Sequence, residues 1–164
     1  MKKFVKYSLY GLIYPVIIFF LSAMFIVTAK ADLTEPNKVI EPYQVVKIQL
    51  TGLMNNDTPN INSGIEQTWK FAHPTNKKYT GPLPKFISLL NSESYKMLLN
   101  HMESEIIKVF KSSSRYGFEV TILAKNKSYY KFQWIVEKHY EEGFLKDCWL
   151  TTSVSSPVSL GSSI

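Results

Sequence analysis

The chain contains one cysteine, which rules out a common way of stabilising a small domain. Cys148 has no second cysteine to pair with, so no internal disulfide can form. Cys and His residues at the spacings of zinc sites are absent from the sequence as well. We therefore expect no metal and no cofactor, and we expect Cys148 to be a small apolar residue in a strand beside Trp149.

Excess charge of one sign is also scarce beyond the N-terminal segment. The whole chain carries a formal net charge of +6, but four of its 19 basic residues precede Asp32, where no acidic residue occurs. From Asp32 onward the net charge is therefore only about +2. This is too small for the basic surface that nucleic-acid binding requires, so we expect no nucleic-acid partner.

One long hydrophobic run is present, and it lies near the N-terminus. It extends from Val16 to Val27, follows three lysines that end at Lys6, and precedes the triplet Ala29-Lys30-Ala31. A basic start, an apolar core of roughly 7–15 residues and an A-x-A site are typical of a secretory signal peptide. The pattern predicts that residues 1–31 form a targeting segment.

Two fates of this segment fit the pattern. A signal peptide would be cleaved after Ala31. The charge-free stretch 7–29 is also comparable with the roughly 20 residues of a transmembrane helix, so the segment could remain as an N-terminal membrane anchor. The lysines before the run keep the N-terminus on the cytoplasmic side in either case. We therefore expect residues 32–164 on the non-cytoplasmic side, either exported or anchored in a membrane.

The rest of the chain divides into three parts. Residues 32–42 are mostly polar, contain two prolines and are expected to form a spacer. Residues 43–155 suffice for a single domain of ordinary size. Residues 156–164 are small and polar, and we expect them to be a flexible tail.

Apolar residues in the first part of the domain recur at helical spacing. The first helix is predicted from Tyr43 to Leu53, with apolar residues three or four positions apart. The second is predicted to start at Thr58-Pro59 and to end before Pro74. A loop over residues 75–84 and one or two helical turns over 85–91 are expected next, followed by a third helix over 92–102.

Beyond Ser104 the period of the apolar residues changes to two, which is typical of strands. Strands are expected at 106–111, 118–122, 130–136 and 144–154, the last three joined by short turns into an antiparallel meander. Phe132, Trp134 and Val136 alternate with Gln133 and Glu137, so the first set should face the helices and the second set solvent. Helices followed by strands predict an α+β domain with the helices on one face of the sheet.

Several residues carry a family resemblance, and they occur in this order: Gln49, Asn56-Asp57, Phe71-Ala72-His73-Pro74-Thr75-Asn76, Gly81-Pro82-Leu83, Phe86, Cys148-Trp149-Leu150-Thr151 and Val154. On these residues the chain from Val45 to Pro157 resembles an uncharacterised family, the domain of unknown function numbered 4864, within the nuclear transport factor 2-like (cystatin-like) superfold. The resemblance implies three helices packed on a curved four-stranded antiparallel sheet, which together form a cone. It implies no established activity, because this superfold hosts enzymes, ligand carriers and scaffolds. Homodimers through the outer face of the sheet are common in it.

Enzymes of this superfold generally work in the mouth of the cone, where His, Asp or Tyr side chains transfer protons. Asp57 and His101 are the weak candidates for such a base here, in a dehydratase or isomerase. Their ordinary roles are a turn for Asp57 and a helix C-terminal cap for His101. His73 is expected in a loop and His139 at an exposed strand end. Because spacing pairs none of these residues, we predict no catalytic residue.

The strands and the segment before them are rich in aromatic residues, which either fill a core or line a cavity. The candidate ligand-binding residues are Tyr79, Phe86, Tyr130 and Trp134. The sequence therefore favours a non-catalytic domain that binds a small apolar ligand or a protein partner, with a homodimer as a further expectation. An enzyme of the dehydratase or isomerase kind is the alternative.

Overall fold

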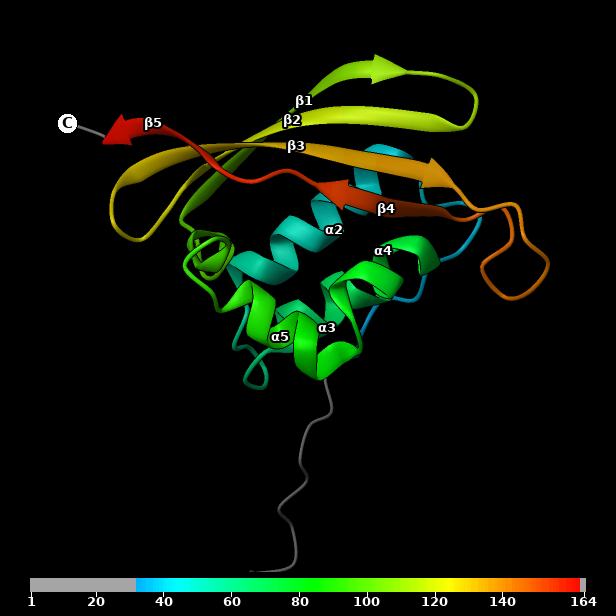
Figure 1. Ribbon diagram of the computed structural model, residues 1–164, viewed down its shortest axis with the longest axis horizontal. Helices are drawn as coiled ribbons and strands as arrows, with labels where there is room; N and C mark the ends of the chain where they lie inside the picture. The colour runs from blue at the N-terminus through cyan, green and yellow to red at the C-terminus, as the bar shows by residue number, and fades with distance from the viewer. Residues whose placement is uncertain (1–31, 163–164) are drawn as a thin grey trace, which may run out of the picture. The chain divides into compact units, whose positions relative to one another are not determined.

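The computed structural model describes residues 32–162, so the expected signal or anchor segment 1–31 lies outside the described residues. These residues form one compact unit. Between residues 32 and 162 no helix has the length and apolarity that a membrane span requires. The described part is an α+β domain in which helices come first and an antiparallel sheet follows (Figure 1).

Four α-helices and one 3-10 turn make up the helical part of the described chain. Their bounds are α2 Pro42–Met54, α3 Ser63–Lys70, α4 Pro74–Thr80, α5 Leu83–Leu90 and η2 Lys96–Leu98. Helix α2 starts with Pro42 in its first turn and a capping box between Glu41 and Gln44, which satisfies backbone groups that the helix leaves open. Its buried side chains form the centre of the core, as the helical spacing predicted.

Two glycines bring α2 and α3 close together. A Cβ atom on Gly64 would lie 2.0 Å from the carbonyl oxygen of Gly52, so only glycine permits this approach. Neighbouring side chains from the two helices can therefore form hydrogen bonds across the contact.

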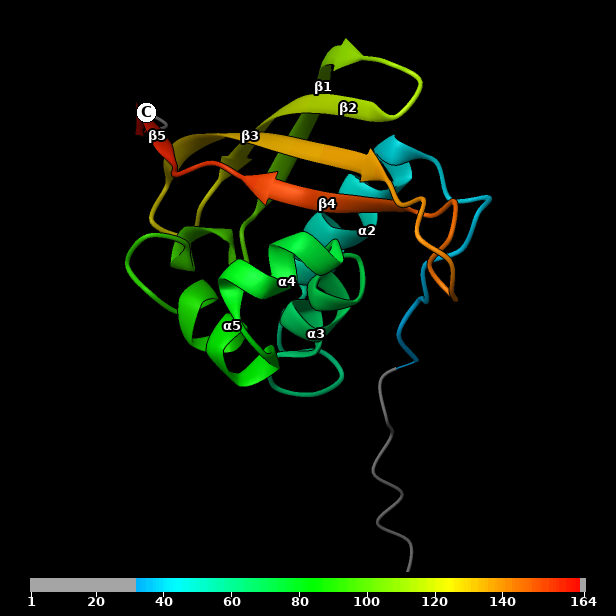
Figure 2. The same cartoon turned by 45° about the vertical axis from the view of Figure 1, so that its right-hand side comes forward.

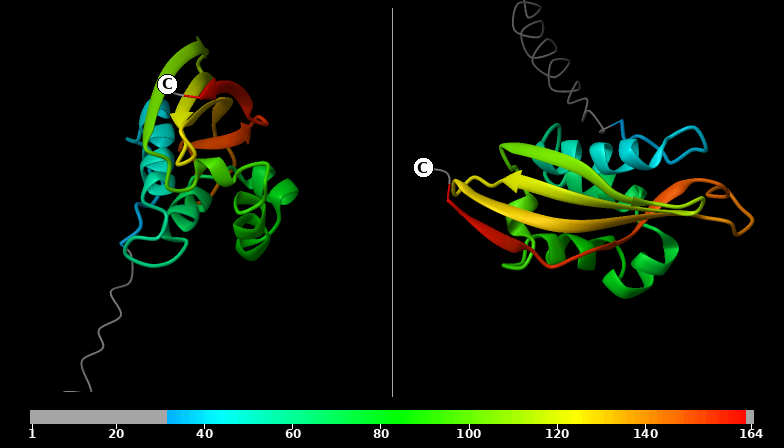
Figure 3. Two further views of the ribbon diagram at one scale, coloured as in Figure 1. Left: turned by 90° about the vertical axis from the view of Figure 1, so that its left-hand side faces the viewer. Right: turned by 90° about the horizontal axis from the view of Figure 1, so that it is seen from above.

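Five strands form one antiparallel sheet: β1 Glu103–Lys111, β2 Arg115–Leu123, β3 Ser128–Lys138, β4 Trp149–Val154 and β5 Val158–Ser162. The first four lie in sequence order, and β5 pairs with the first half of β3. Strands β4 and β5 therefore lie end to end along the same edge of β3, and Figure 2 shows them in line. The helices cover one face of this sheet, as the views in Figure 3 also show.

The register of the sheet separates a buried face from an outer face. Trp134 lies opposite Phe118, and Phe132 lies opposite Val120; all four side chains are buried against the helices. Gln133 lies between them on the outer face and is exposed. The predicted alternation along β3 is therefore confirmed.

The helical part differs from the prediction in three places. Residues 74–80 form α4 where a loop was expected, because His73 accepts a hydrogen bond from the backbone N–H of Thr75 and so caps a helix that begins at Pro74. The second helix starts at Ser63, after the turn that contains Thr58-Pro59. The expected third helix over 92–102 is only the 3-10 turn η2: Leu99 is already extended, and Asn100 then takes a positive φ of 54° that a helix does not allow.

The end of the chain also needs correction. The fourth strand begins at Trp149 instead of at residue 144, since Asp147 has a positive φ of 64° that interrupts an extended chain. The expected flexible tail from residue 156 contains β5, which pairs with Ser128–Lys131 where the shorter β4 leaves the edge of β3 open. The side chains of β5 are all exposed, so apolar alternation could not reveal this strand.

The expected spacer is attached to the domain. The side chain of Gln67 accepts a hydrogen bond from the backbone N–H of Thr34 at 2.8 Å and donates one to its carbonyl oxygen at 2.9 Å. Glu35 forms an ion pair with Lys70, and Pro36 is buried. From Thr34 onward the stretch is part of the folded structure.

Candidate functional site

A cluster of polar side chains is buried where α2, α3, β3 and β4 meet. The indole N–H of Trp134 donates to Gln49 Oε1 at 3.0 Å and to Thr151 Oγ1 at 3.2 Å. The Thr151 hydroxyl in turn donates to Gln49 Oε1 at 2.6 Å, and Gln49 Nε2 donates to the carbonyl oxygen of Thr68. Every polar atom of these side chains has a partner, so the cluster ties the helices to the sheet and carries no unsatisfied group.

The backbone of Thr151 extends this connection to α4. Its N–H donates to the carbonyl oxygen of Phe71, and its own carbonyl oxygen accepts from the N–H of His73 and from the side-chain amide of Asn76. Ala72 therefore pairs with Thr151 as an isolated parallel bridge. The start of α4 is thus fixed to β4 beside the polar cluster.

A cavity of about 80 Å³ lies next to this cluster. Its polar side is formed by Gln49, Thr68, Asn76, Thr80 and Thr151, and its apolar side by Leu53, Ala72, Phe86, Leu89, Leu90, Tyr95, Leu98, Trp134 and Val154. Only one of these side chains, Tyr95, is ionisable. The arrangement can hold an apolar group against amide and hydroxyl groups, and it offers no carboxylate or imidazole to move a proton.

Helix α4 forms part of the cavity wall through Asn76 and Thr80. None of the seven residues of α4 is fully buried. Because little apolar surface holds this short helix in place, its position depends on hydrogen bonds at its start and on its contact with β4.

Two of the four predicted ligand-binding residues line the cavity. These two are Phe86 and Trp134. Phe86 also packs on Trp69, with the ring centroids 5.2 Å apart. Tyr79 is 81% exposed on α4, the helix whose Asn76 and Thr80 do line the cavity. Tyr130 packs against the core, and its hydroxyl accepts a hydrogen bond from Asn126. Neither tyrosine is among the cavity residues.

Asp57 is exposed in the turn between α2 and α3. Its carboxylate accepts hydrogen bonds from the side chain of Asn100, the backbone of Asn62 and the side chain of Asn56. These bonds lower the pKa of Asp57 below its ordinary value, and the bond from Asn100 has the largest effect. A general base in an apolar pocket would have a raised pKa, so Asp57 organises the turn, as its ordinary role predicted.

His101 is buried, with 2% of its surface exposed, but it does not line the cavity. Its Nδ1 lies 2.7 Å from the carbonyl oxygen of Leu98, so Nδ1 carries the proton and donates it. Nε2 is buried without a partner among the described residues. Burial lowers the pKa of His101, with the bond to Leu98 opposing this effect. The neutral ring is therefore fixed in one tautomer inside the core.

The structure pairs two histidines that the sequence did not connect. His139 Nδ1 lies 3.1 Å from His73 Nε2, although the two residues are 66 positions apart along the chain. His139 was expected at an exposed strand end, but it is 6% exposed. No spacing rule relates a helix cap to the end of a distant strand, so only Pro74, which follows His73 directly, could have marked His73 as a helix start.

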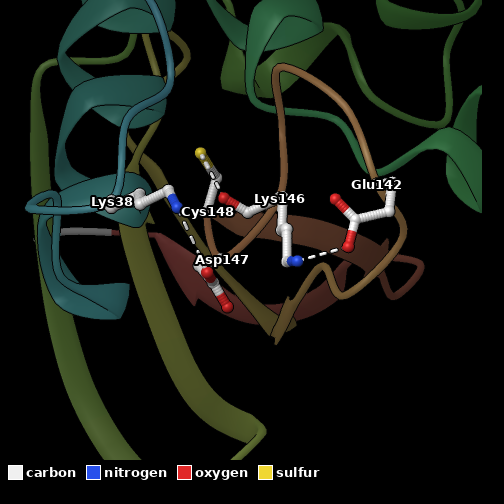
Figure 4. Close-up of polar contacts among 5 residues, drawn as sticks. All are labelled: Lys38, Glu142, Lys146, Asp147 and Cys148. Atoms are coloured by element: carbon white, nitrogen blue, oxygen red, sulfur yellow. Dashed lines mark hydrogen bonds and ion pairs between the residues drawn. The ribbon is translucent and has the colours of Figure 1, made fainter.

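The loop between β3 and β4 holds the single cysteine (Figure 4). Cys148 is buried, and burial raises the pKa of its thiol. Lys146 pairs with Glu142 across the loop, and Asp147 pairs with Lys38 at 3.3 Å. The thiol is thus enclosed and protonated, which makes it a poor nucleophile.

A wider hollow of about 640 Å³ lies between α2, α3 and residues 32–34. Its walls include exposed side chains such as Gln44, Lys47 and Thr51, so a ligand there would remain largely in water. In the part of the chain that the structure describes, no group of three His, Cys, Asp or Glu residues is placed to hold a metal ion. The cavity beside Trp134 is less open to solvent and is therefore the better candidate site.

In comparisons with known proteins, no protein-family model, curated protein or solved structure matches this chain.

Proposed function

We propose that the domain is a non-catalytic binding module that receives a small apolar group in the cavity beside Trp134. The observation that supports this most strongly is the cavity itself, which has an apolar wall from α5 and β3 and a polar wall from α2, α3 and α4. Small-molecule sites generally combine such apolar surface with a few fixed polar groups. The enzyme alternative has less support, because Tyr95 is the only ionisable side chain in the lining.

The volume limits what can enter. About 80 Å³ is well below the roughly 300–1,000 Å³ of sites for drug-sized ligands, and below the roughly 150 Å³ of an engineered cavity that binds benzene. The occupant in this conformation is thus a group of a few heavy atoms, such as the end of an alkyl chain. A larger ligand would need α4 to move.

Two probes test this size: xenon, which can enter whole, and 1-hexanol, of which only the alkyl end would enter. We expect both to shift the methyl NMR signals of the cavity residues Leu90, Leu98 and Val154 in residues 32–164. Ala72→Val should abolish the shifts, because its added methyl groups occupy the cavity. Tyr79→Ala is the matched control and should leave them unchanged, since Tyr79 is outside the cavity. Absence of shifts with both probes in the native sequence would contradict the proposal.

We further propose that the architecture is the nuclear transport factor 2-like cone. The support is the order of helices before strands, the placement of the helices on one face of the sheet, and the cavity between them. The location that goes with this proposal is outside the cytoplasm, exported or membrane-anchored, and its support remains the basic and apolar pattern of residues 1–31.

A second function, homodimer formation, is favoured by apolar residues on the outer face of the sheet. Ile107 and Phe110 are 47% and 45% exposed, and Phe110 lies over Gly117 beside Ile135. Sedimentation velocity of residues 32–164 tests this: we expect a dimer that Phe110→Glu dissociates. A monomer at concentrations of about 100 μM would exclude a stable dimer.

A further inference from the structure

The hydrogen bonds of His73 fix where its proton lies. The backbone N–H of Thr75 donates to His73 Nδ1 at 3.1 Å, so Nδ1 carries no proton. In the neutral ring the proton must then be on Nε2, which faces His139 Nδ1 at 3.1 Å. His139 Nδ1 therefore accepts, and the proton of His139 is on its own Nε2. Thr75, His73 and His139 thus form a directed chain of hydrogen bonds that requires both rings to be neutral.

We propose that His73 and His139 form a proton-sensitive latch that holds the start of α4 against the end of β3 and releases it when either ring is protonated. The latch connects two segments far apart in sequence. His73 is the N-cap of α4, and the backbone of His139 is bonded to Asp147 and Cys148 in the loop before β4.

A single added proton cannot be accommodated without loss of a bond. On His73 it would occupy Nδ1, where it meets the N–H of Thr75 and removes the cap. On His139 it would occupy Nδ1 and meet the Nε2–H of His73. If His73 then moved its own proton to Nδ1, the cap would again be lost. Every protonated form therefore breaks either the cap of α4 or the link to His139.

The surroundings set the pH at which this happens. Burial lowers the pKa of His73 below 6.5, and so does His139, whereas Glu137 on β3 and Glu141 in the loop raise it. The groups that bond His73 from α4 and β4, the N–H of Thr75 and the carbonyl oxygen of Thr151, are uncharged. The first two effects dominate, so the pKa of His73 lies below 6.5 and this ring takes up a proton only in acid.

The same tautomer argues against a metal ion between the rings. A metal on His73 Nε2 would require the ring proton on Nδ1, where the N–H of Thr75 already points. The pair is thus a hydrogen-bonded latch and not half of a metal centre.

Release of α4 would also open the cavity, because Asn76 and Thr80 of α4 form part of its wall. This consequence rests on the proposed binding function, but the latch itself does not. The latch can therefore be tested without a ligand.

Backbone hydrogen exchange of residues 32–164 at pH 7.5 and pH 5.0, corrected for intrinsic rates, provides the test. The reporters are the amides of Lys77 and Gly81, whose acceptors are the carbonyl oxygens of His73 and Lys77. We expect their protection to fall at least tenfold at pH 5.0 and to stay below that of Leu50 and Leu53 in the core of α2, because α4 opens locally without unfolding of the whole domain. Equal protection of the reporters at both pH values would overturn the proposal, as would reporters that exchange only together with Leu50 and Leu53 at pH 5.0.

The matched variant is His73→Asn, because asparagine caps a helix but does not titrate in this range. We expect the protection of Lys77 and Gly81 to change less than threefold between the two pH values. An undiminished tenfold fall in this variant would overturn the latch. Nitrogen-15 NMR of the native sequence at pH 7.5 needs no variant: the proton of His73 should be on Nε2, and a proton on Nδ1 would contradict the proposal.

Discussion

Among single residues, Thr151 connects the most parts of the fold. Its hydroxyl joins Gln49 and Trp134, and its backbone joins the chain on both sides of Ala72. A satisfied buried network of this kind is costly to interrupt, because a buried donor or acceptor that loses its partner keeps its desolvation penalty.

We expect Thr151→Val to lower the free energy of unfolding by about 1–3 kcal/mol, since valine keeps the shape of threonine but removes the hydroxyl. Thr152→Val is the control: Thr152 is partly exposed, and its hydroxyl donates a long hydrogen bond of 3.4 Å to the carbonyl oxygen of Ile135. This control should change the free energy by less than about 0.5 kcal/mol. Urea denaturation of both variants gives the comparison, and equal effects would show that the network adds no stability of its own.

Two histidines make the stability depend on pH. The pKa values of His73 and His101 in the folded domain lie below the ordinary value of 6.5. At pH values between 6.5 and these lowered pKa values, the unfolded chain therefore binds more protons than the folded one. Their stabilising effect is complete above pH 6.5 and is lost as the pH falls through the folded pKa values. The unfolding free energy should fall by at most about 1.4 kcal/mol per pH unit for each histidine.

Urea denaturation between pH 7.5 and pH 5 measures this slope. His73→Asn should reduce it, because one of the two groups no longer titrates. A stability that stays constant down to pH 5 in the native sequence would show that neither ring is held neutral by the fold.

At the scale of elements, strand β5 illustrates how backbone pairing can act without buried side chains. Its five residues are exposed, so its contribution comes from hydrogen bonds to β3. By pairing with β3, strand β5 covers part of a sheet edge that would otherwise be open to pairing with another chain.

Truncation after Pro157 tests that contribution. We expect it to lower the free energy of unfolding by about 1–2 kcal/mol, the size expected for a few exposed backbone hydrogen bonds. Hydrogen exchange at Tyr129 and Lys131 should become faster, while Phe118 in β2 serves as the internal reference. Unchanged exchange at β3 would mean that β5 is not paired in solution.

The sequence predicted elements well where burial follows a period. The apolar residues of α2 repeat every three or four positions, and the buried Phe132, Trp134 and Val136 alternate with exposed or half-buried residues, so each buried face could be recognised. It failed for α4, which buries no residue, and for β5, which is exposed throughout. In both cases the element is set by a cap or by a strand edge, which a pattern of side chains does not record.

The candidate site could be predicted only in part, for a related reason. Phe86 and Trp134 were identified because aromatic residues are conspicuous in either a core or a cavity wall. The polar wall was not identified, because its residues acquire their roles from contacts between distant parts of the chain. Asn76 and Thr151 are 75 positions apart, and Gln49 is 85 positions from Trp134 and 102 from Thr151. The His73–His139 pair was missed for the same reason.

For the molecule as a whole, location is the prediction most open to direct measurement. Mass spectrometry of the protein from its native host should find either a mature N-terminus at Asp32 or a full-length chain retained in the membrane fraction. The physical reason is the combination of a lysine-rich start, an apolar run and an A-x-A site. Intact full-length protein in the soluble cytoplasmic fraction would exclude both forms.

Occupancy of the cavity is the claim on which the proposed function depends, and native mass spectrometry of the protein purified from its own host tests it most directly. The native sequence should retain a small molecule with an apolar end, and Ala72→Val should be free of it while keeping the native circular dichroism spectrum, because the added methyl groups fill space beside Thr151. Native protein without any bound molecule, or an Ala72→Val variant that retains the same molecule, would contradict binding in this cavity.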